Sequence, residues 1–259
     1  MQRIFHTPEG VRDIYSQECS RKQKLQEKLH RVFHQYGFED IETPTFEYFE
    51  VFSKEVGTIP SRELYKFFDR EGNTLVLRPD FTPSVSRACA TYFNPEKEVV
   101  SLCYTGNTFI NNSSFRGRLK ETTQMGVERM GDDSPEADAE ILAMTVECLL
   151  ATGLTEFQVS VGQVDYYKAI FAQTGLSQEE EEELRELISQ KNYFGVEELV
   201  KNKNMDKSLA RVLSQLPQMF GSTEVLEKAK SLTDNPQALK AVARLEEIYE
   251  LLKVYGYEK

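Results

Sequence analysis

The chain has 259 residues, of which 40% are hydrophobic and 28% are charged, and its formal net charge at pH 7 is −11. This length allows one substantial core plus a smaller second unit, so we expect one or two domains. The acidic balance repels a polyphosphate backbone and disfavours nucleic acid as a partner. No stretch has the length and apolarity of a membrane span or a signal peptide, and the expected location is the cytoplasm.

The first predicted element is a long amphipathic helix that ends at Gly37. Its apolar face carries five residues at helical spacing, namely Leu25, Leu29, Val32, Phe33 and Tyr36. A strand is predicted over residues 38–43, before the boundary that Pro44 marks. Residues 65–69 and 74–77 flank a polar turn and predict a β-hairpin.

A second helix is predicted to open at Thr82, where a Thr-Pro start precedes small and apolar residues. Two further strands are predicted over 99–104 and 124–131, as antiparallel partners. A long polar loop from Asn107 to Glu121 is predicted to join them. In the second of these strands, alternation places Gln124 and Glu128 on one face.

A helix with an acidic first turn is predicted from Asp133 to Gly153, and another strand is predicted from Phe157. Hairpins and single helices, without a repeated βαβ rhythm, favour an antiparallel sheet in an α+β fold. The boundary of a second, mainly helical domain is predicted near Gly162. The two predicted domains are residues 1–162 and residues 163–259.

The second domain carries apolar stripes at helical spacing between Leu184 and Leu252. Such stripes are more typical of the core of a small bundle than of a partner groove. Five consecutive glutamates at 179–183 are interpreted as the acidic start of a helix and not as a calcium site.

The four cysteines are widely separated and lack CxxC spacing, so neither a zinc site nor a disulfide framework is predicted. They are Cys19, Cys89, Cys103 and Cys148, and we expect reduced, mostly buried thiols. His30 and His34 lie four apart on a predicted helix, a spacing that can bind metal. No third ligand is evident near them in the sequence, so they are interpreted as surface residues, and neither a metal nor a cofactor is predicted. Arg116 and Arg118, together with Lys120, form either a solvated loop or an anion contact, and both interpretations stay open.

Five motifs resemble, in order and spacing, the core of histidyl-tRNA synthetases, which are class II aminoacyl-tRNA synthetases. They are TPEGVRDI at 7–14, YGFEDIETP at 36–44, LRPDFT at 77–82, YTG at 104–106 and QMGVE at 124–128. The resemblance covers about residues 3–165. It implies an antiparallel catalytic-core sheet flanked by helices, followed by a helical insertion domain, which clasps tRNA in that family.

The ATP chemistry of that family is missing at two positions. The resemblance implies an arginine and a glutamate where Ile110 and Asn112 stand. A bidentate guanidinium suits the charge of a phosphoryl group, and an isoleucine cannot replace it. The third motif, the histidine loop and the anticodon-binding domain of the family are not found before Lys259, so we expect a fragment of a longer protein.

The amino-acid pocket of the family, in contrast, is retained. The resemblance implies that four residues contact histidine, namely Asp80, Thr82, Gln124 and Glu128. An ammonium group needs carboxylate acceptors, and an imidazole N–H needs a further acceptor. Asp80 is one methylene shorter than the glutamate of the family, and Phe81 and Pro83 replace small residues. The alternative is that these are inherited polar groups without a ligand.

The chain is also similar to one branch of this superfamily, the regulatory subunits of ATP phosphoribosyltransferase, through DFTP at 80–83 and DDSPEADAE at 132–140. This similarity implies a non-catalytic chain that forms a hetero-octamer with a catalytic subunit and makes the first step of histidine biosynthesis sensitive to L-histidine. It also implies a homodimer through the region of 36–44. The alternatives are a fragment of an active histidyl-tRNA synthetase, which Ile110 and Asn112 oppose, and a synthetase-like paralogue that senses uncharged tRNA or modifies another protein.

Overall fold

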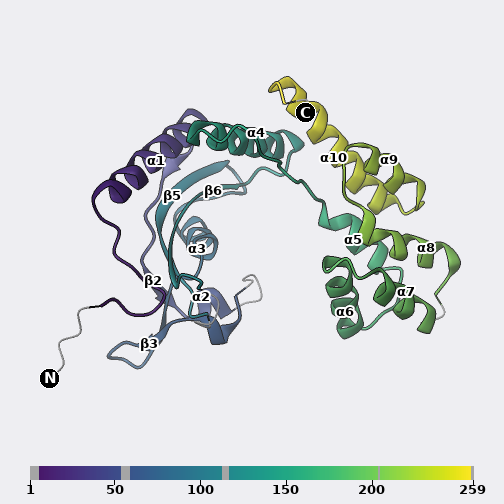
Figure 1. Cartoon of the computed structure of the whole chain (residues 1–259), viewed down its shortest axis with the longest axis horizontal. Helices are drawn as coiled ribbons and strands as arrows, with labels where there is room; N and C mark the ends of the chain where they lie inside the picture. Colours follow the sequence, from purple (N-terminus) through teal and green to yellow (C-terminus); the bar gives the residue numbers. More distant parts are fainter. Residues whose placement is uncertain (1–5, 54–58, 113–116, 204, 258–259) are drawn as a thin grey trace. The chain divides into compact units, whose positions relative to one another are not determined.

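The computed structural model describes four stretches of the chain, residues 6–53, 59–112, 117–203 and 205–257 (Figure 1). They form two compact units, a first unit of Met1–Asp133 with Met144–Glu156 and a second unit of Ser134–Ala143 with Phe157–Lys259. The predicted boundary near Gly162 lies in the connection between α4 (Pro135–Thr152) and α5 (Val164–Phe171). A division into domains at that residue stays a prediction.

In the first unit, helix α1 (Ser16–Gln35) confirms the predicted amphipathic helix and buries Val32 and Phe33. The chain leaves it at Gly37, whose φ of 78° lies in the left-handed region that glycine adopts without strain. The turn at Gly37 brings the following strand back alongside the helix (Figure 1).

The main sheet of the first unit has the strand order β1–β5–β6. Strand β5 (Val100–Phe109) pairs antiparallel with β6 (Glu121–Met130), as predicted, and parallel with the two-residue strand β1 (Glu39–Asp40). Only these two residues of the strand predicted over 38–43 join the sheet.

The predicted loop between β5 and β6 is wrong at both ends, because Asn107 to Phe109 belong to β5 and Glu121 begins β6. Their polar side chains have partners across the strands. The amide of Asn107 donates to Glu121 at 2.7 Å, and the hydroxyls of Thr108 and Thr122 lie 3.0 Å apart. Such cross-strand pairs allow a polar run to remain in a sheet.

A second sheet of the first unit has the order β2–β4–β3, with β2 at Phe46–Tyr48, β3 at Lys66–Phe68 and β4 at Thr74–Leu77. The antiparallel pairing of β3 with β4 confirms the predicted hairpin. A short helix, α2 (Glu50–Ser53), and a 3₁₀ turn, η1 (Ser61–Glu63), lie between β2 and β3 along the chain.

Helix α3 (Thr82–Tyr92) opens at Thr82 as predicted. It packs Val85 and Cys89 against Leu102 and Tyr104 of β5 in a buried cluster. Gly153 ends α4 as predicted, with φ of 93°.

The strand predicted from Phe157 is wrong. Among the described residues, 157–162 belong to no strand, and Val161 is 45% exposed. Alternating apolar residues stabilise a strand only where a neighbouring strand takes up its backbone hydrogen bonds. This segment pairs with none of the described strands.

The second unit is helical, as predicted. After α5 it contains α6 (Gln178–Ser189), α7 (Tyr193–Asn202), α8 (Lys207–Gln215), η3 (Leu216–Gln218), α9 (Glu224–Ser231) and α10 (Pro236–Val254). Leu184, Leu213, Leu216 and Val242 lie in one buried cluster, which confirms that the apolar stripes form a bundle core.

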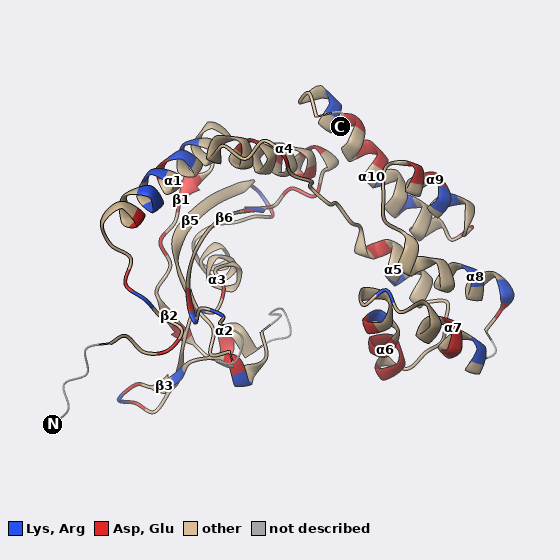
Figure 2. Cartoon of the chain, viewed as in Figure 1, with Lys and Arg blue, Asp and Glu red and all other residues tan. Residues whose placement is uncertain are grey.

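The glutamate run opens α6, where Figure 2 shows clustered acidic residues. Ser177 and Glu180 form a capping box at that end of the helix. This confirms the predicted acidic start of a helix. Among the described residues, no helix combines the length and the apolarity that a membrane crossing requires.

Candidate functional site

The candidate site lies in the first unit, where the β5–β6 ladder meets the start of α3. The register places Tyr104 opposite Gly126, Gly106 opposite Gln124, and Leu102 opposite Glu128. Every second residue of a strand shares a face. Gln124 and Glu128 therefore share the face of Tyr104, as the alternation of the sequence predicted.

Three side chains converge on this face. The hydroxyl of Thr82 donates a hydrogen bond of 2.6 Å to Oε1 of Glu128. The phenol of Tyr104 lies within hydrogen-bonding reach of both groups. The first turn of α3 thus meets the middle of β6 through groups that are 46 residues apart in the chain.

The site contains two partly buried carboxyl groups, those of Asp80 and Glu128. Burial raises the pKa of Glu128, and the nearby charge of Asp80 raises it further, while the hydrogen bond from Thr82 acts in the opposite direction. Burial also raises the pKa of Tyr104, with Glu128 and Asp80 adding to the shift. Asp80 and Glu128 take part in none of the ion pairs found among the described residues. A cation bound between them would relieve their repulsion.

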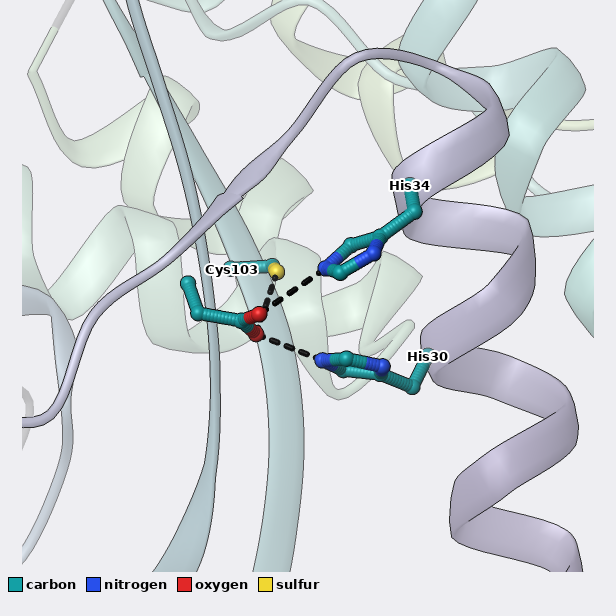
Figure 3. Close-up of side chains that lie close together, drawn as sticks. His30, His34 and Cys103 are labelled. Carbon is teal, nitrogen blue, oxygen red and sulfur yellow. Dashed lines mark hydrogen bonds and ion pairs between the residues drawn. The ribbon is translucent and has the colours of Figure 1, made fainter.

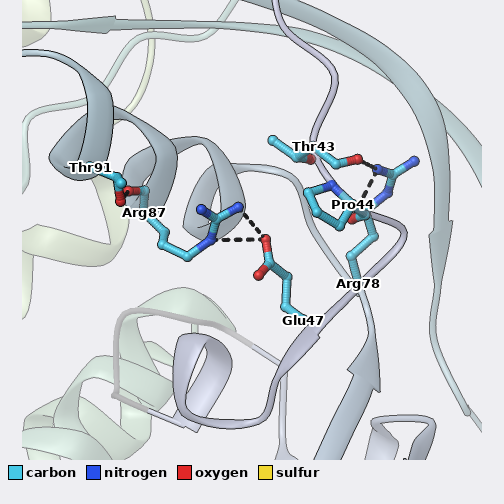
Figure 4. Close-up of polar contacts among 6 residues, drawn as sticks. All are labelled: Thr43, Pro44, Glu47, Arg78, Arg87 and Thr91. Carbon is cyan, nitrogen blue, oxygen red and sulfur yellow. Dashed lines mark hydrogen bonds and ion pairs between the residues drawn. The ribbon is translucent and has the colours of Figure 1, made fainter.

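Arg78 lies beneath the polar groups of the site and contacts the residues that support them. Its guanidinium is buried and donates to the backbone carbonyls of Thr43 and Asn107, each at 2.8 Å. Figure 4 shows it reaching Thr43. The guanidinium also lies 4.0 Å from the ring centre of Phe81, and that ring stacks on Tyr104 at 4.2 Å and 8°.

Phe81 is 1% exposed and therefore belongs to the core beneath Tyr104. This places the residue that replaces a small one of the family in a supporting position and not among the polar groups of the site. Sequence reasoning named neither Arg78 nor Tyr104 as a site residue. Both residues lie within motifs that carry the family resemblance, LRPDFT at 77–82 and YTG at 104–106, and this was the signal that could have found them.

The remaining predicted residues lie nearby with fewer contacts. Oδ1 of Asp80 accepts the backbone N–H of Phe81 at 2.7 Å. Gln124 is half-buried on the same face as Glu128 and makes no side-chain hydrogen bond to any described residue. The structure thus brings Thr82 and Glu128 into direct contact and places Asp80 close enough to affect Glu128, while Gln124 stands apart on β6.

Ile110 and Asn112, which stand where the family resemblance implies an ATP-binding arginine and a glutamate, lie at the end of the β5–β6 hairpin. The backbone N–H of Ile110 donates to the carbonyl of Lys120 at 2.9 Å, which continues the hairpin beyond the strands. The amide of Asn112 donates to the carbonyl of Leu119 at 3.4 Å. Arg118 is exposed, and Arg116 lies outside the described residues, so the anion contact at these two arginines stays a prediction.

The family model described as histidyl-tRNA synthetase matches residues 10–258. The chain belongs to the histidyl-tRNA synthetase family. The chain is similar to a crystal structure from Nostoc sp. that is described as histidyl-tRNA synthetase, with a TM-score of 0.77 at 19% sequence identity. The match covers 99% of this chain and 59% of the Nostoc chain. That likeness confirms the predicted class II synthetase-like α+β fold.

Within this family, the chain is similar to proteins named ATP phosphoribosyltransferase regulatory subunit. Those from Acetivibrio thermocellus and Clostridium acetobutylicum are 41% and 37% identical over 98% and 97% of the chain. The chain spans 61% and 62% of their lengths. A crystal structure from Bacillus halodurans is described as an ATP phosphoribosyltransferase regulatory subunit/histidyl-tRNA synthetase. It matches this chain with a TM-score of 0.88 at 31% sequence identity, and the match covers 100% of this chain and 67% of the Bacillus chain.

Proposed function

We propose that this chain is part of a regulatory subunit of ATP phosphoribosyltransferase, which binds L-histidine and controls a separate catalytic subunit in the first step of histidine biosynthesis. The observation that carries the proposal is the pair of partly buried acids, Asp80 and Glu128, neither of which forms an ion pair with another described residue. A free amino acid brings an ammonium group that pairs with carboxylates. The hydroxyls of Thr82 and Tyr104 and the amide of Gln124 would serve its other polar groups.

The chain itself is proposed to be non-catalytic. At Ile110 and Asn112 it lacks the charged side chains that the synthetase chemistry needs, and loss of such a clamp removes orders of magnitude in rate. The names of the relatives from Acetivibrio thermocellus and Clostridium acetobutylicum support the same conclusion.

The proposed assembly is a cytoplasmic hetero-octamer with the catalytic subunit, in which this chain also forms a homodimer through the region of 36–44. L-histidine would act as an effector and not as a substrate. Regulation of this kind needs only that histidine binds one state of the assembly more tightly than another, and no bond has to form.

The alternative function is that of a histidyl-tRNA synthetase fragment. It is supported by the description of the family model and by the double name of the Bacillus halodurans structure. The two functions differ in one property, since a synthetase must bind ATP beside histidine.

Calorimetric titration of the purified chain with histidine, and separately with ATP, tests the proposal. We expect histidine to bind and ATP not to bind. Glu128→Gln should lower the affinity for histidine by about 10-fold or more, because a hydrogen bond to a charged group is worth about 1.5–3 kcal/mol. Glu96→Gln is the matched control, since Glu96 is an exposed acid of the same unit and its loss should leave the affinity unchanged.

ATP binding, or histidine-dependent exchange of pyrophosphate into ATP, would refute the regulatory function and support the synthetase. A second assay adds the chain to the catalytic subunit of the same organism and measures phosphoribosyl transfer. Activation that histidine suppresses is the expected result. A chain that leaves the catalytic subunit unchanged and does not bind it would overturn the proposed partnership.

A further inference from the structure

Four side chains with metal-binding atoms meet on the outer side of the main sheet of the first unit (Figure 3). They are His30 and His34 of α1, Asp40 of β1 and Cys103 of β5. Nε2 of His30 lies 2.5 Å from Oδ1 of Asp40, and Nε2 of His34 lies 3.0 Å from Oδ2. Sγ of Cys103 lies 3.4 Å from Oδ1 of the same carboxylate.

The topology of the first unit explains why these residues meet. Positions i and i+4 lie on one face of a helix, so His30 and His34 point in the same direction. The turn at Gly37 returns the chain along α1, and the parallel pairing of β1 with β5 places Asp40 directly beside Cys103. Because Leu102 and Tyr104 face the core beneath α3, Cys103 faces α1.

The interpretation of the two histidines from the sequence is therefore wrong in one respect. It found no third ligand near them, whereas the fold supplies a carboxylate and a thiol. The missing ligands were hidden because Asp40 follows a chain reversal and Cys103 lies 63 residues further along the chain.

We propose that His30, His34, Asp40 and Cys103 form a tetrahedral binding site for a zinc ion. Their ligand atoms all lie within 4.8 Å of one another. In a tetrahedral zinc site, with metal–ligand distances of about 2.0–2.3 Å, neighbouring ligand atoms lie roughly 3.3–3.8 Å apart. Small side-chain movements are enough to bring the four ligand atoms from their present positions to the corners of such a tetrahedron.

The chemistry of the four ligands selects zinc among common cations. Imidazole and thiolate are ligands of zinc and of other late transition metals, whereas magnesium and calcium prefer oxygen ligands only. Two neutral imidazoles, one carboxylate and one thiolate balance the double charge of the ion. The four protein ligands complete a closed coordination shell, which is typical of a structural site.

The site also offers a path for the ion and a defined proton balance. The side chains of His30, His34 and Asp40 are 40%, 46% and 56% exposed, while Cys103 lies buried beneath them. Burial, together with Asp40, raises the pKa of the Cys103 thiol to about 12. Binding therefore forms the Zn–S bond, breaks the S–H bond and releases one proton to solvent, so the affinity rises with pH.

Titration of the full chain with Co²⁺, after reduction and removal of metal by a chelator, tests the site. We expect one equivalent to give the visible absorption of tetrahedral Co²⁺ together with a near-ultraviolet band of thiolate-to-cobalt charge transfer. Zn²⁺ should abolish both signals by displacing the probe. Bound Zn²⁺ should also raise the thermal unfolding midpoint, because it binds the folded state.

Two variants and two matched controls assign the ligands. Cys103→Ser should abolish the charge-transfer band. His34 is exposed, so His34→Gln should leave the fold intact. We expect it to lower the affinity for Co²⁺ by at least about 10-fold, since even the hydrogen-bond partners of metal ligands contribute about 10–100-fold to metal affinity. Cys148→Ser and His6→Gln change the same residue types outside the cluster and should bind Co²⁺ as the parent does.

Three results would overturn the proposal. The first is a titration without saturable tetrahedral absorption. The second is saturable absorption that His34→Gln leaves unchanged, which would place the ion elsewhere. The third is binding without a thiolate band in the parent chain, which would remove Cys103 from the coordination shell and with it the four-ligand site.

Discussion

The phenol oxygen of Tyr104 occupies the space that a side chain at Gly126 would need. The two residues are direct partners in the β5–β6 ladder, and a Cβ at Gly126 would overlap the hydroxyl and the ring of Tyr104. The ring can therefore lie across the neighbouring strand, within reach of Thr82 and Glu128. Glycine at this position in the strand is a requirement of the site.

The first prediction concerns Gly126→Ala. We expect a loss of about 1–3 kcal/mol in the free energy of unfolding, as is typical of overpacking, and a clear loss of histidine affinity because Tyr104 must move. Gly162→Ala is the matched control, since beyond its chain neighbours no described residue has an atom within 4 Å of the added Cβ, and it should not lower the free energy of unfolding. Urea unfolding and calorimetry measure the two effects. Unchanged histidine binding in Gly126→Ala would show that the position of Tyr104 does not matter to the ligand.

The second prediction concerns pH. Burial, and after it the charge of Asp80, raises the pKa of Glu128 in the folded chain. The stability that this group contributes is therefore fully present below the unfolded pKa of about 4.3 and is lost as the pH rises through the folded pKa. Glu128→Gln has no such loss, and its amide oxygen can still accept from Thr82.

We therefore expect Glu128→Gln to gain stability relative to the parent chain as the pH rises from about 4 to 7, the range above the ordinary pKa of a glutamate. Urea unfolding of both chains at several pH values measures the difference, in which titrating groups that do not interact with Glu128 cancel. A difference that stays constant over this range, or that falls with pH, would contradict the raised pKa.

The elements that the sequence predicted correctly are those with a local physical cause. The amphipathic period of α1, the turn before β4 and the acidic first turn of α6 each act within a few residues. The two errors in the sheet have the opposite origin. Asn107 is polar yet stays in β5 because Glu121 pairs with it, whereas Phe157 belongs to an alternating run that pairs with none of the described strands.

The same distinction applies to the candidate site. The alternation of β6 was enough to place Gln124 and Glu128 on one face. The contact of Glu128 with Thr82 spans 46 residues, so spacing could not predict it, and the family resemblance implied only that both residues belong to one pocket. The cluster around Asp40 was missed because its ligands come from three elements, and only the pairing of β1 with β5 brings Cys103 to the histidines.

The third prediction concerns the ion pair between the buried Glu47 of β2 and the partly exposed Arg87 of α3, which Figure 4 shows. Arg87 donates twice to Oε1 of Glu47, at 2.7 and 3.1 Å, and Glu47 is 8% exposed. Arg87→Met leaves a buried carboxylate without its partner and should cost about 3–5 kcal/mol.

Adding Glu47→Gln to Arg87→Met removes the unpaired charge, and we expect the double variant to regain part of the lost stability. Arg12→Met is the matched control, because Arg12 pairs with Glu18 at an exposed position, and its loss should change the unfolding midpoint little. Urea unfolding of the four chains completes the comparison. A double variant less stable than Arg87→Met would show that the charge of Glu47 has another stabilising partner.

The fourth prediction concerns the core of the second unit. Leu213 of α8 is fully buried in the cluster that also contains Leu184 and Val242, so Leu213→Ala leaves a cavity and should cost about 2–5 kcal/mol. Phe194 of α7 is 84% exposed, and Phe194→Ala should stay within about 0.5 kcal/mol of the parent although it removes a larger side chain. Thermal and urea unfolding, followed by helical circular dichroism, compare the two. Phe194→Ala removes the larger side chain but should destabilise the chain less, so side-chain size alone cannot produce the expected difference. Equal destabilisation by both variants would mean that Leu213 is not buried in a core that these helices share.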